Sequence, residues 1–203
     1  NKAKYFITNF SSAFGMLKQR LLNRKDLVSI NKIIQNEFGF CPQIKYIEHH
    51  ACHLASAFYS SPFKNSTIVS IDGSGDFSTI MIAKGIDNKI EIIESQDFPF
   101  SVGIMYTAFT QYLGFPYYGD EYKVMGLSPY GSPKYINQIR SMIWSGKKNI
   151  IEWDSSFFDL SKGAIYYESN LPIPHKLFSK MFIKLFGSSR EKDEKINQKH
   201  MDI

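Results

Sequence analysis

Three short runs rich in β-branched and aliphatic residues follow one another in the middle of the chain. The runs cover residues 67–71, 78–83 and 90–93. The two gaps between them are short and contain glycine. Such connections join antiparallel neighbours, because a parallel crossover needs about a dozen residues or more. The sequence therefore predicts a three-stranded antiparallel meander opened by residue 67.

Apolar residues recur every three or four positions on both sides of this meander, which predicts helices. The expected helices cover residues 10–22, 27–38, 51–59, 102–112, 133–144 and 176–186. Short strands are expected at residues 5–7 and 45–48 and within 149–167, and a loop rich in Gly, Pro and Tyr at 115–130. The predicted fold class is α/β.

Composition excludes several classes of protein. With 43% hydrophobic and 15% aromatic residues, the chain is not disordered. The net charge of +5 comes from scattered residues without a basic run, so a nucleic-acid-binding arm is not expected. There is no apolar stretch of membrane-spanning length, and two cysteines are too few for a disulfide framework, so we expect a cytoplasmic protein. The start at Asn1 and the uncapped end at Ile203 suggest a fragment of a longer reading frame.

Three of the five histidines fall within five residues, at His49, His50 and His53. On a helix, residues four positions apart lie about 40° apart and roughly 6 Å along the axis, so His49 and His53 can converge on one metal ion. His50 would point elsewhere. A polar helix start without a metal is the commoner reason for such a pair, and a third ligand would decide between the two interpretations.

Asp72 is the candidate third ligand, because it ends an apolar strand and precedes Gly73, Ser74, Gly75 and Asp76. The glycines can adopt positive φ and let backbone N–H groups approach a phosphate. We therefore expect Gly75→Val to weaken anion binding without disturbing the metal. The alternative is a plain hairpin turn, in which Asp, Gly and Ser are ordinary residues.

The segment 119–127 places two acids and a lysine among apolar residues. Lys123 could meet a phosphate, or it could pair with Glu121. Cys52 lies next to His53, but adjacent helical positions diverge by about 100°, so these two residues do not form a nucleophilic dyad.

Several strings together resemble the amino-terminal domain of the O-carbamoyltransferases, a family that includes nodulation-factor and antibiotic-modifying enzymes. They are EHHACHLASAFYSSPF at 48–63, IDGSGD at 71–76, PFSVGIMY at 99–106, YLGF at 112–115 and GDEYKVMGLSPYG at 119–131. The resemblance is strong over about residues 45–135 and weak elsewhere.

The resemblance implies an actin-like, sugar-kinase-like architecture of two ribonuclease H-like halves around a nucleotide cleft. Residues 1–64 would end the first half and include the HxxxH helix, and residues 65–203 would begin the second half, with truncation at both ends. It also implies a metal, iron or another divalent ion, held by His49, His53 and Asp72, with a fourth ligand outside this chain.

The implied donor is carbamoyladenylate, made from carbamoyl phosphate and ATP. Its phosphate would lie at Gly73, Ser74 and Gly75, with Asp76 where the family usually has Glu, and Lys123 would contact an anionic group of the donor. The implied reaction moves the carbamoyl group to a hydroxyl of a small-molecule or sugar acceptor. No catalytic residue is assigned, and the isolated chain is expected to be inactive.

Two other functions stay open at this stage. The enzymes that attach threonylcarbamoyl to tRNA adenosine have the same fold and a similar HxxxH pair, and the basic pI near 9.0 favours them slightly. The string at 121–127 resembles the O-carbamoyltransferases instead. A nucleotide- and metal-binding module without turnover is the second alternative.

Overall fold

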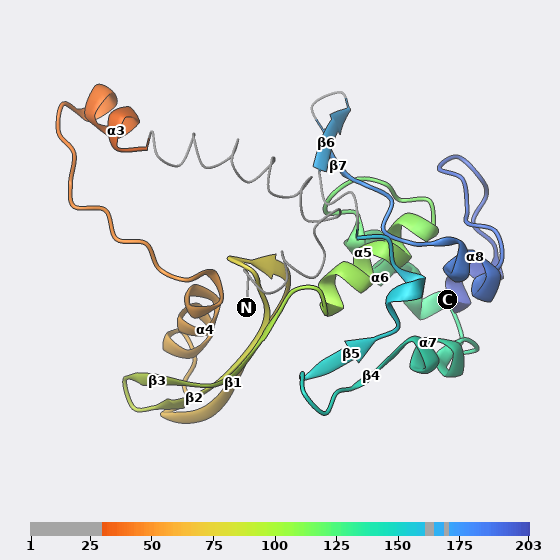
Figure 1. Cartoon of the computed structure of the whole chain (residues 1–203), viewed down its shortest axis with the longest axis horizontal. Coiled ribbons are helices and arrows are strands. Elements are labelled where there is room, and N and C mark those ends of the chain that lie inside the picture. The colour runs from red at the N-terminus through yellow and green to blue at the C-terminus, as the bar shows by residue number, and fades with distance from the viewer. Residues whose placement is uncertain (1–29, 161–164, 169–170) are drawn as a thin grey trace.

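The computed structural model describes residues 30–160, 165–168 and 171–203. Its first two helices are α3 (Ile30–Phe38) and α4 (His49–Tyr59), and the connection between them forms no helix or strand. Figure 1 shows α3 lying apart from the other labelled elements, and none of its residues is buried. The expected helix at 27–38 is thus confirmed from Ile30 onward, whereas the elements expected at 5–7 and 10–22 lie outside the described residues.

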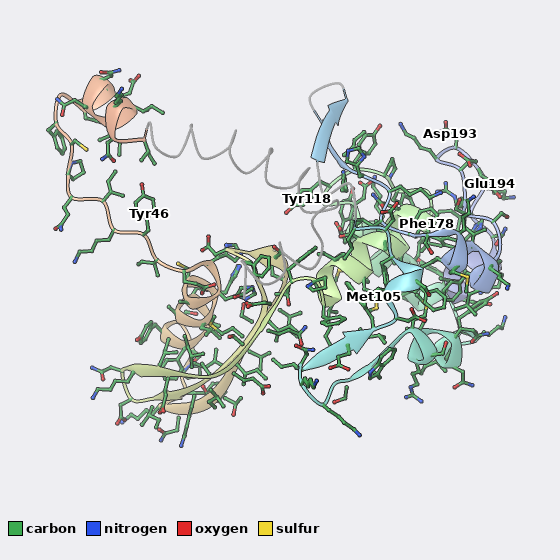
Figure 2. The ribbon with its side chains drawn as sticks, in the orientation of Figure 1. Tyr46, Met105, Tyr118, Phe178, Asp193 and Glu194 are labelled. Carbon is green, nitrogen blue, oxygen red and sulfur yellow. The ribbon has the colours of Figure 1, made fainter. Side chains whose placement is uncertain are left out.

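The strand expected at residues 45–48 is wrong. The segment precedes α4 as irregular chain, no strand of the described residues pairs with it, and Tyr46 and Ile47 are 74% and 69% exposed. Tyr46 projects from this connection in Figure 2. An extended segment needs a hydrogen-bonding neighbour to become a strand, and apolar spacing alone does not supply one.

The central meander is confirmed. It consists of β1 (Asn65–Gly75), β2 (Ser78–Ile86) and β3 (Lys89–Asp97), antiparallel and in that order. Helix α4 packs on one face of this sheet around a small core formed by Leu54, Phe58, Ile68, Met81 and Ala83. On β1 the exposed Val69 and Ile71 alternate with buried residues, as expected of a strand with only one face covered.

The turn between β1 and β2 is not where the glycines suggested. Asp76 and Phe77 form the two-residue loop, and both have positive φ, 50° and 98°. This is the backbone twist that two-residue hairpin loops favour. Gly73 and Gly75 lie within β1, and neither has a positive φ. Sequence reasoning assigned the turn to them because glycine is the usual carrier of that conformation.

The remaining elements form a second region. They are α5 (Val102–Tyr112), α6 (Glu121–Leu127), η1 (Ser128–Tyr130), α7 (Ile136–Met142), β4 (Ile143–Ser145), β5 (Ile151–Trp153), η2 (Ser155–Phe157), β6 (Ile165–Glu168), β7 (Leu171–Pro174), α8 (Lys180–Phe186) and α9 (Gln198–Asp202). The loop expected at 115–130 is wrong over α6 and η1, where good helix formers such as Glu, Lys, Met and Leu outweigh one glycine. Helices α7 and α8 are shorter than expected. No helix of the described residues is long and apolar enough to cross a bilayer.

Aromatic rings fill the core of this second region. The buried residues are Ala108, Phe109, Tyr112, Leu113, Met142, Trp153, Phe158, Phe178, Phe182 and Phe186. Phe182 is fully buried, and its ring lies 4.8 Å from that of Phe109 and 4.9 Å from that of Phe186, centre to centre. The Tyr112 hydroxyl lies 3.0 Å from the carbonyl oxygen of Phe186, and burial raises the pKa of this phenol to about 12. The ring cluster thus joins α5 to α8.

Candidate metal centre

Two carboxylates hold the first turn of α4. The Asp76 Oδ2 accepts the backbone N–H of His49 at 3.0 Å, and the N-cap residue Glu48 accepts the N–H of Ala51 at 2.6 Å. The first N–H groups of a helix have no intrahelical partner, and side-chain oxygens are their usual acceptors. Because Asp76 lies in the hairpin loop, its bond ties the start of α4 to the end of β1.

The structure brings together the three residues that the sequence proposed as ligands. His49 Nε2 lies 2.8 Å from Asp72 Oδ2 and 3.0 Å from His53 Nε2, and His53 Nε2 lies 3.7 Å from the same oxygen. A circle through these atoms has a radius of about 1.9 Å, shorter than metal–nitrogen and metal–oxygen bonds of about 2.0–2.2 Å. One ion just off their plane can therefore contact all three, and the donor set fits a divalent metal.

The three side chains are partly open to solvent, and the Asp72 carboxyl has a lowered pKa, which favours the ionised form that binds a cation. Their exposed fractions are 42% for His49, 52% for His53 and 41% for Asp72. Burial acts to raise the pKa of Asp72. Hydrogen bonds from His49 and from the Gly73 N–H, together with the charges of the nearby imidazoles, outweigh this effect of burial, so the net result is a lowered pKa. The second oxygen of Asp72 accepts that N–H at 2.6 Å. Oδ2 thus remains, as an ionised ligand, on the histidine side.

A β-bulge aims Asp72 at the histidines. The pairing of β1 with β2 is regular as far as Ile71 and resumes only at Gly75. A bulge bends its strand and redirects side chains, and bulges occur often beside functional sites. Sequence reasoning missed this irregularity, although glycines inside a strand, here Gly73 and Gly75, often mark a bulge.

The two glycines after Asp72 have different surroundings. A Cβ atom on Gly75 would overlap the ring of His49, whereas a Cβ on Gly73 would meet no atom within 4 Å. This geometry argues against the expectation that Gly75→Val would spare the metal, because any side chain there would displace the ring of His49. Gly73 is the residue at which backbone approach can be blocked without touching the histidines.

The start of α5 contacts the backbone at Asp72 and Gly73. Ser101 is fully buried, and its hydroxyl oxygen caps α5 by accepting the Ile104 N–H. The same oxygen lies 2.9 Å from the carbonyl oxygen of Asp72 and 2.6 Å from that of Gly73. A Cβ on Gly103 would lie 2.5 Å from the Gly73 nitrogen, so only glycine allows this approach. Sequence reasoning missed both residues. The available signal was a serine at a helix start, followed by a glycine that weakens the helix without local reason.

The expected ion pair between Lys123 and Glu121 does not form. The Lys123 Nζ lies 2.6 Å from Asp120 Oδ1 and 5.6 Å from the centre of the Phe115 ring. Glu121 instead accepts a hydrogen bond from Thr107 at 2.6 Å. The expected partner Glu121 is thus replaced by Asp120, which lies three residues before the lysine.

The amino-acid sequence of this chain is similar to those of known proteins. The family model for the carbamoyltransferase N-terminus matches residues 2–203. An uncharacterised protein of Synechocystis sp. is 35% identical over 173 residues, 82% of this chain and 26% of that protein. The nodulation protein NolNO of Sinorhizobium fredii is 41% identical over 104 residues, 50% of this chain and 15% of its own length. NolO of Bradyrhizobium diazoefficiens is 42% identical over 93 residues, 46% of this chain and 17% of that protein.

The chain spans less than a third of the length of these relatives. The match to the family model, however, runs over almost every residue of the chain, including all three candidate ligands. The chain therefore belongs to the carbamoyltransferase family, whose amino-terminal region it matches.

Proposed function

We propose that this chain contributes the metal centre of an O-carbamoyltransferase, which moves a carbamoyl group from carbamoyladenylate to a hydroxyl of a small-molecule or sugar acceptor. The convergence of His49, His53 and Asp72 within a carbamoyltransferase sequence carries the proposal.

The two imidazoles and one carboxylate would hold a divalent ion, and we propose iron. A bound metal supplies Lewis-acid stabilisation of charge that develops on a phosphate or carbonyl oxygen. His49 and His53 approach from one turn of α4 and Asp72 from β1, so the protein presents ligands from one side and leaves the other side open. Nitrogen and oxygen donors of this kind also accept zinc and manganese.

The donor phosphate would lie beside Gly73 and Ser74, where the space next to Gly73 is open. Gly75 would pack against the His49 ring and not contact the phosphate. The Asp76 carboxylate already accepts a hydrogen bond from the His49 N–H. Lys123 remains the proposed contact for an anionic group, with Asp120 holding it in place. An actin-like fold with a nucleotide cleft is part of this proposal.

Metal content is the direct test. The purified chain, loaded with ferrous iron under anaerobic conditions and desalted, is expected to retain about one ion, measured by elemental analysis. His49→Ala removes a ligand atom and Asp72→Asn removes the negative charge of another ligand, so both variants are expected to lose the ion. Cys52→Ser is the matched control, because Cys52 is an exposed α4 residue outside the ligand group. Equal iron in all four proteins would refute the metal centre.

Adenylate binding tests the donor site separately. AMP is the probe, titrated into the metal-loaded chain by calorimetry. Gly73→Val fills the open space beside the backbone, so it is expected to weaken AMP binding about tenfold while iron content stays unchanged. If AMP binds both proteins equally, the phosphate does not lie at this turn.

A further inference from the structure

His50 differs from its two neighbours in the histidine cluster, because its ring is fully buried. Its Nδ1 lies 2.7 Å from the hydroxyl oxygen of Ser70, and its Nε2 lies 3.1 Å from the backbone carbonyl oxygen of Ser78. Buried polar groups are nearly always hydrogen-bonded, and here both ring nitrogens are. His50 is therefore a structural link and not a third imidazole ligand.

The chemistry of the two partners determines how the ring is used. A carbonyl oxygen only accepts hydrogen bonds, so Nε2 donates to Ser78. In the neutral ring this leaves Nδ1 to accept the hydrogen of the Ser70 hydroxyl. One tautomer thus satisfies both contacts, and a side chain without a donor and an acceptor at these places cannot replace it.

The positions of the partners connect this ring to the metal centre. Ser70 precedes Asp72 by two residues on β1 and lies in the last regularly paired part of the strand, which ends at Ile71. Ser78 opens β2, directly after the hairpin loop. The His50 ring thus joins the first turn of α4 to the strand on each side of the bulge that carries Asp72.

We propose that His50 is a positioning residue of the metal centre. Its hydrogen bonds to Ser70 and Ser78 set where the first turn of α4 lies against the bulge, and hence where His49 and His53 stand relative to Asp72. On this proposal, replacing His50 would change metal binding, contrary to the simpler expectation that a histidine facing away from the ligands can be removed without effect. The inference rests on the proposed metal centre, and it adds a residue that does not touch the ion.

The test is a titration of the 203-residue chain with Co²⁺, which gives both an affinity and a visible absorption spectrum that reports ligand geometry. His50→Phe keeps a ring of similar size but loses both hydrogen bonds. Partners that orient metal ligands typically change affinity 10- to 100-fold, so we expect at least a tenfold weaker affinity and an altered spectrum. Ser70→Ala removes only the hydroxyl and is expected to give a smaller shift of the same kind.

Two further variants separate positioning from general stability. His50→Gln offers an amide donor and a carbonyl acceptor and is expected to recover part of the affinity. Phe58→Leu trims the same small core at the far end of α4, where Phe58 packs over Gly85. It is expected to lower the unfolding midpoint while leaving the Co²⁺ affinity and spectrum as in the unaltered chain.

The possible results of these titrations distinguish the positioning role of His50 from the metal centre itself. Equal Co²⁺ affinity and spectra for the unaltered chain, His50→Phe and Ser70→Ala would overturn the positioning role while leaving the metal centre intact. Affinity that falls equally in His50→Phe and Phe58→Leu, in step with the unfolding midpoint, would also overturn it. If the unaltered chain binds no Co²⁺, the proposed metal centre itself fails, and this inference fails with it. If His50→Phe does not fold, Ser70→Ala and His50→Gln decide in the same way.

Discussion

The two regions of the molecule are held together by different means. Helix α4 and the strands β1 to β3 share a core of five buried side chains, whereas the region from α5 onward is built on a larger cluster of aromatic rings. In Figure 1 the first region lies at one end and α5 to α8 lie at the other. Figure 2 labels Phe178 of the aromatic cluster and Met105 of α5, which packs against that cluster.

The candidate ligands lie in the region with the smaller core, and hydrogen bonds position them there. Asp76, His50 and Ser101 each connect an element of the site to the backbone or side chain of another. A small core buries little apolar area, so it contributes less to stability than the aromatic cluster does. Polar links specify geometry instead, because each has a donor and an acceptor at fixed places. Core substitutions should therefore mainly change stability, and substitutions at the links should mainly change metal affinity.

The largest effect is expected from Phe182→Ala in the aromatic cluster. Phe182 is fully buried and packs against several rings, so its removal should lower the free energy of unfolding by about 3–5 kcal/mol. The neighbouring Met181→Ala is the control, because Met181 is 43% exposed and should change little. Both values are measured by urea denaturation. A loss under about 1 kcal/mol for Phe182→Ala would show that the aromatic cluster does not dominate the stability of this region.

A smaller effect, on Co²⁺ affinity and not on stability, is expected when Gly75 near Asp72 is replaced. Gly75→Ala places a methyl group where the His49 ring lies and should weaken Co²⁺ binding about tenfold, or about 1.4 kcal/mol. Gly73→Ala adds the same methyl group in open space and serves as the matched control. Calorimetric titration of both variants gives the comparison. Equal affinities would mean that His49 can move aside at no cost, and the contrast between the regions would weaken.

Local patterns were enough to predict the parts of the fold that depend on neighbouring residues. The meander and α5 follow from periodicity. The spacing of His49 and His53 and an acid at a strand end suggested the three candidate ligands, but the set came from the resemblance to the O-carbamoyltransferases. The contact of Gly75 with His49 and the partners of His50 join residues 20 or more positions apart in the chain. The bulge at Asp72 depends on how β1 pairs with β2. Sequence periodicity carries no information on such contacts. The strand expected at 45–48 failed for the same reason, since none of the strands in the described part of the chain pairs with it.

The smallest effect concerns a charge in the second region, where Asp202 holds α9 against η1 and the turn that follows it. Its carboxylate accepts hydrogen bonds from Lys134 at 2.5 Å, Gln198 at 2.9 Å and the Ser132 N–H at 2.8 Å. In that order of importance they lower its pKa to about 2. Because the pKa lies below the ordinary value of about 3.9, this carboxylate stabilises the folded state above pH 4, and the contribution is lost as pH falls from 4 towards 2.

The stability of the chain measured by urea denaturation at pH 6, 4 and 2.5 should therefore fall less steeply in Asp202→Asn than in the unaltered chain. The asparagine variant should also be less stable at pH 6, where only the unaltered chain has the ion pair. Asp154→Asn is the control, because the pKa of Asp154 is lowered by bonds from Ser156 alone. If both variants follow the same pH profile as the unaltered chain, Asp202 does not anchor α9. The acid sensitivity would then arise at Asp72, in the region of the metal centre, where the pKa of a carboxyl is also lowered.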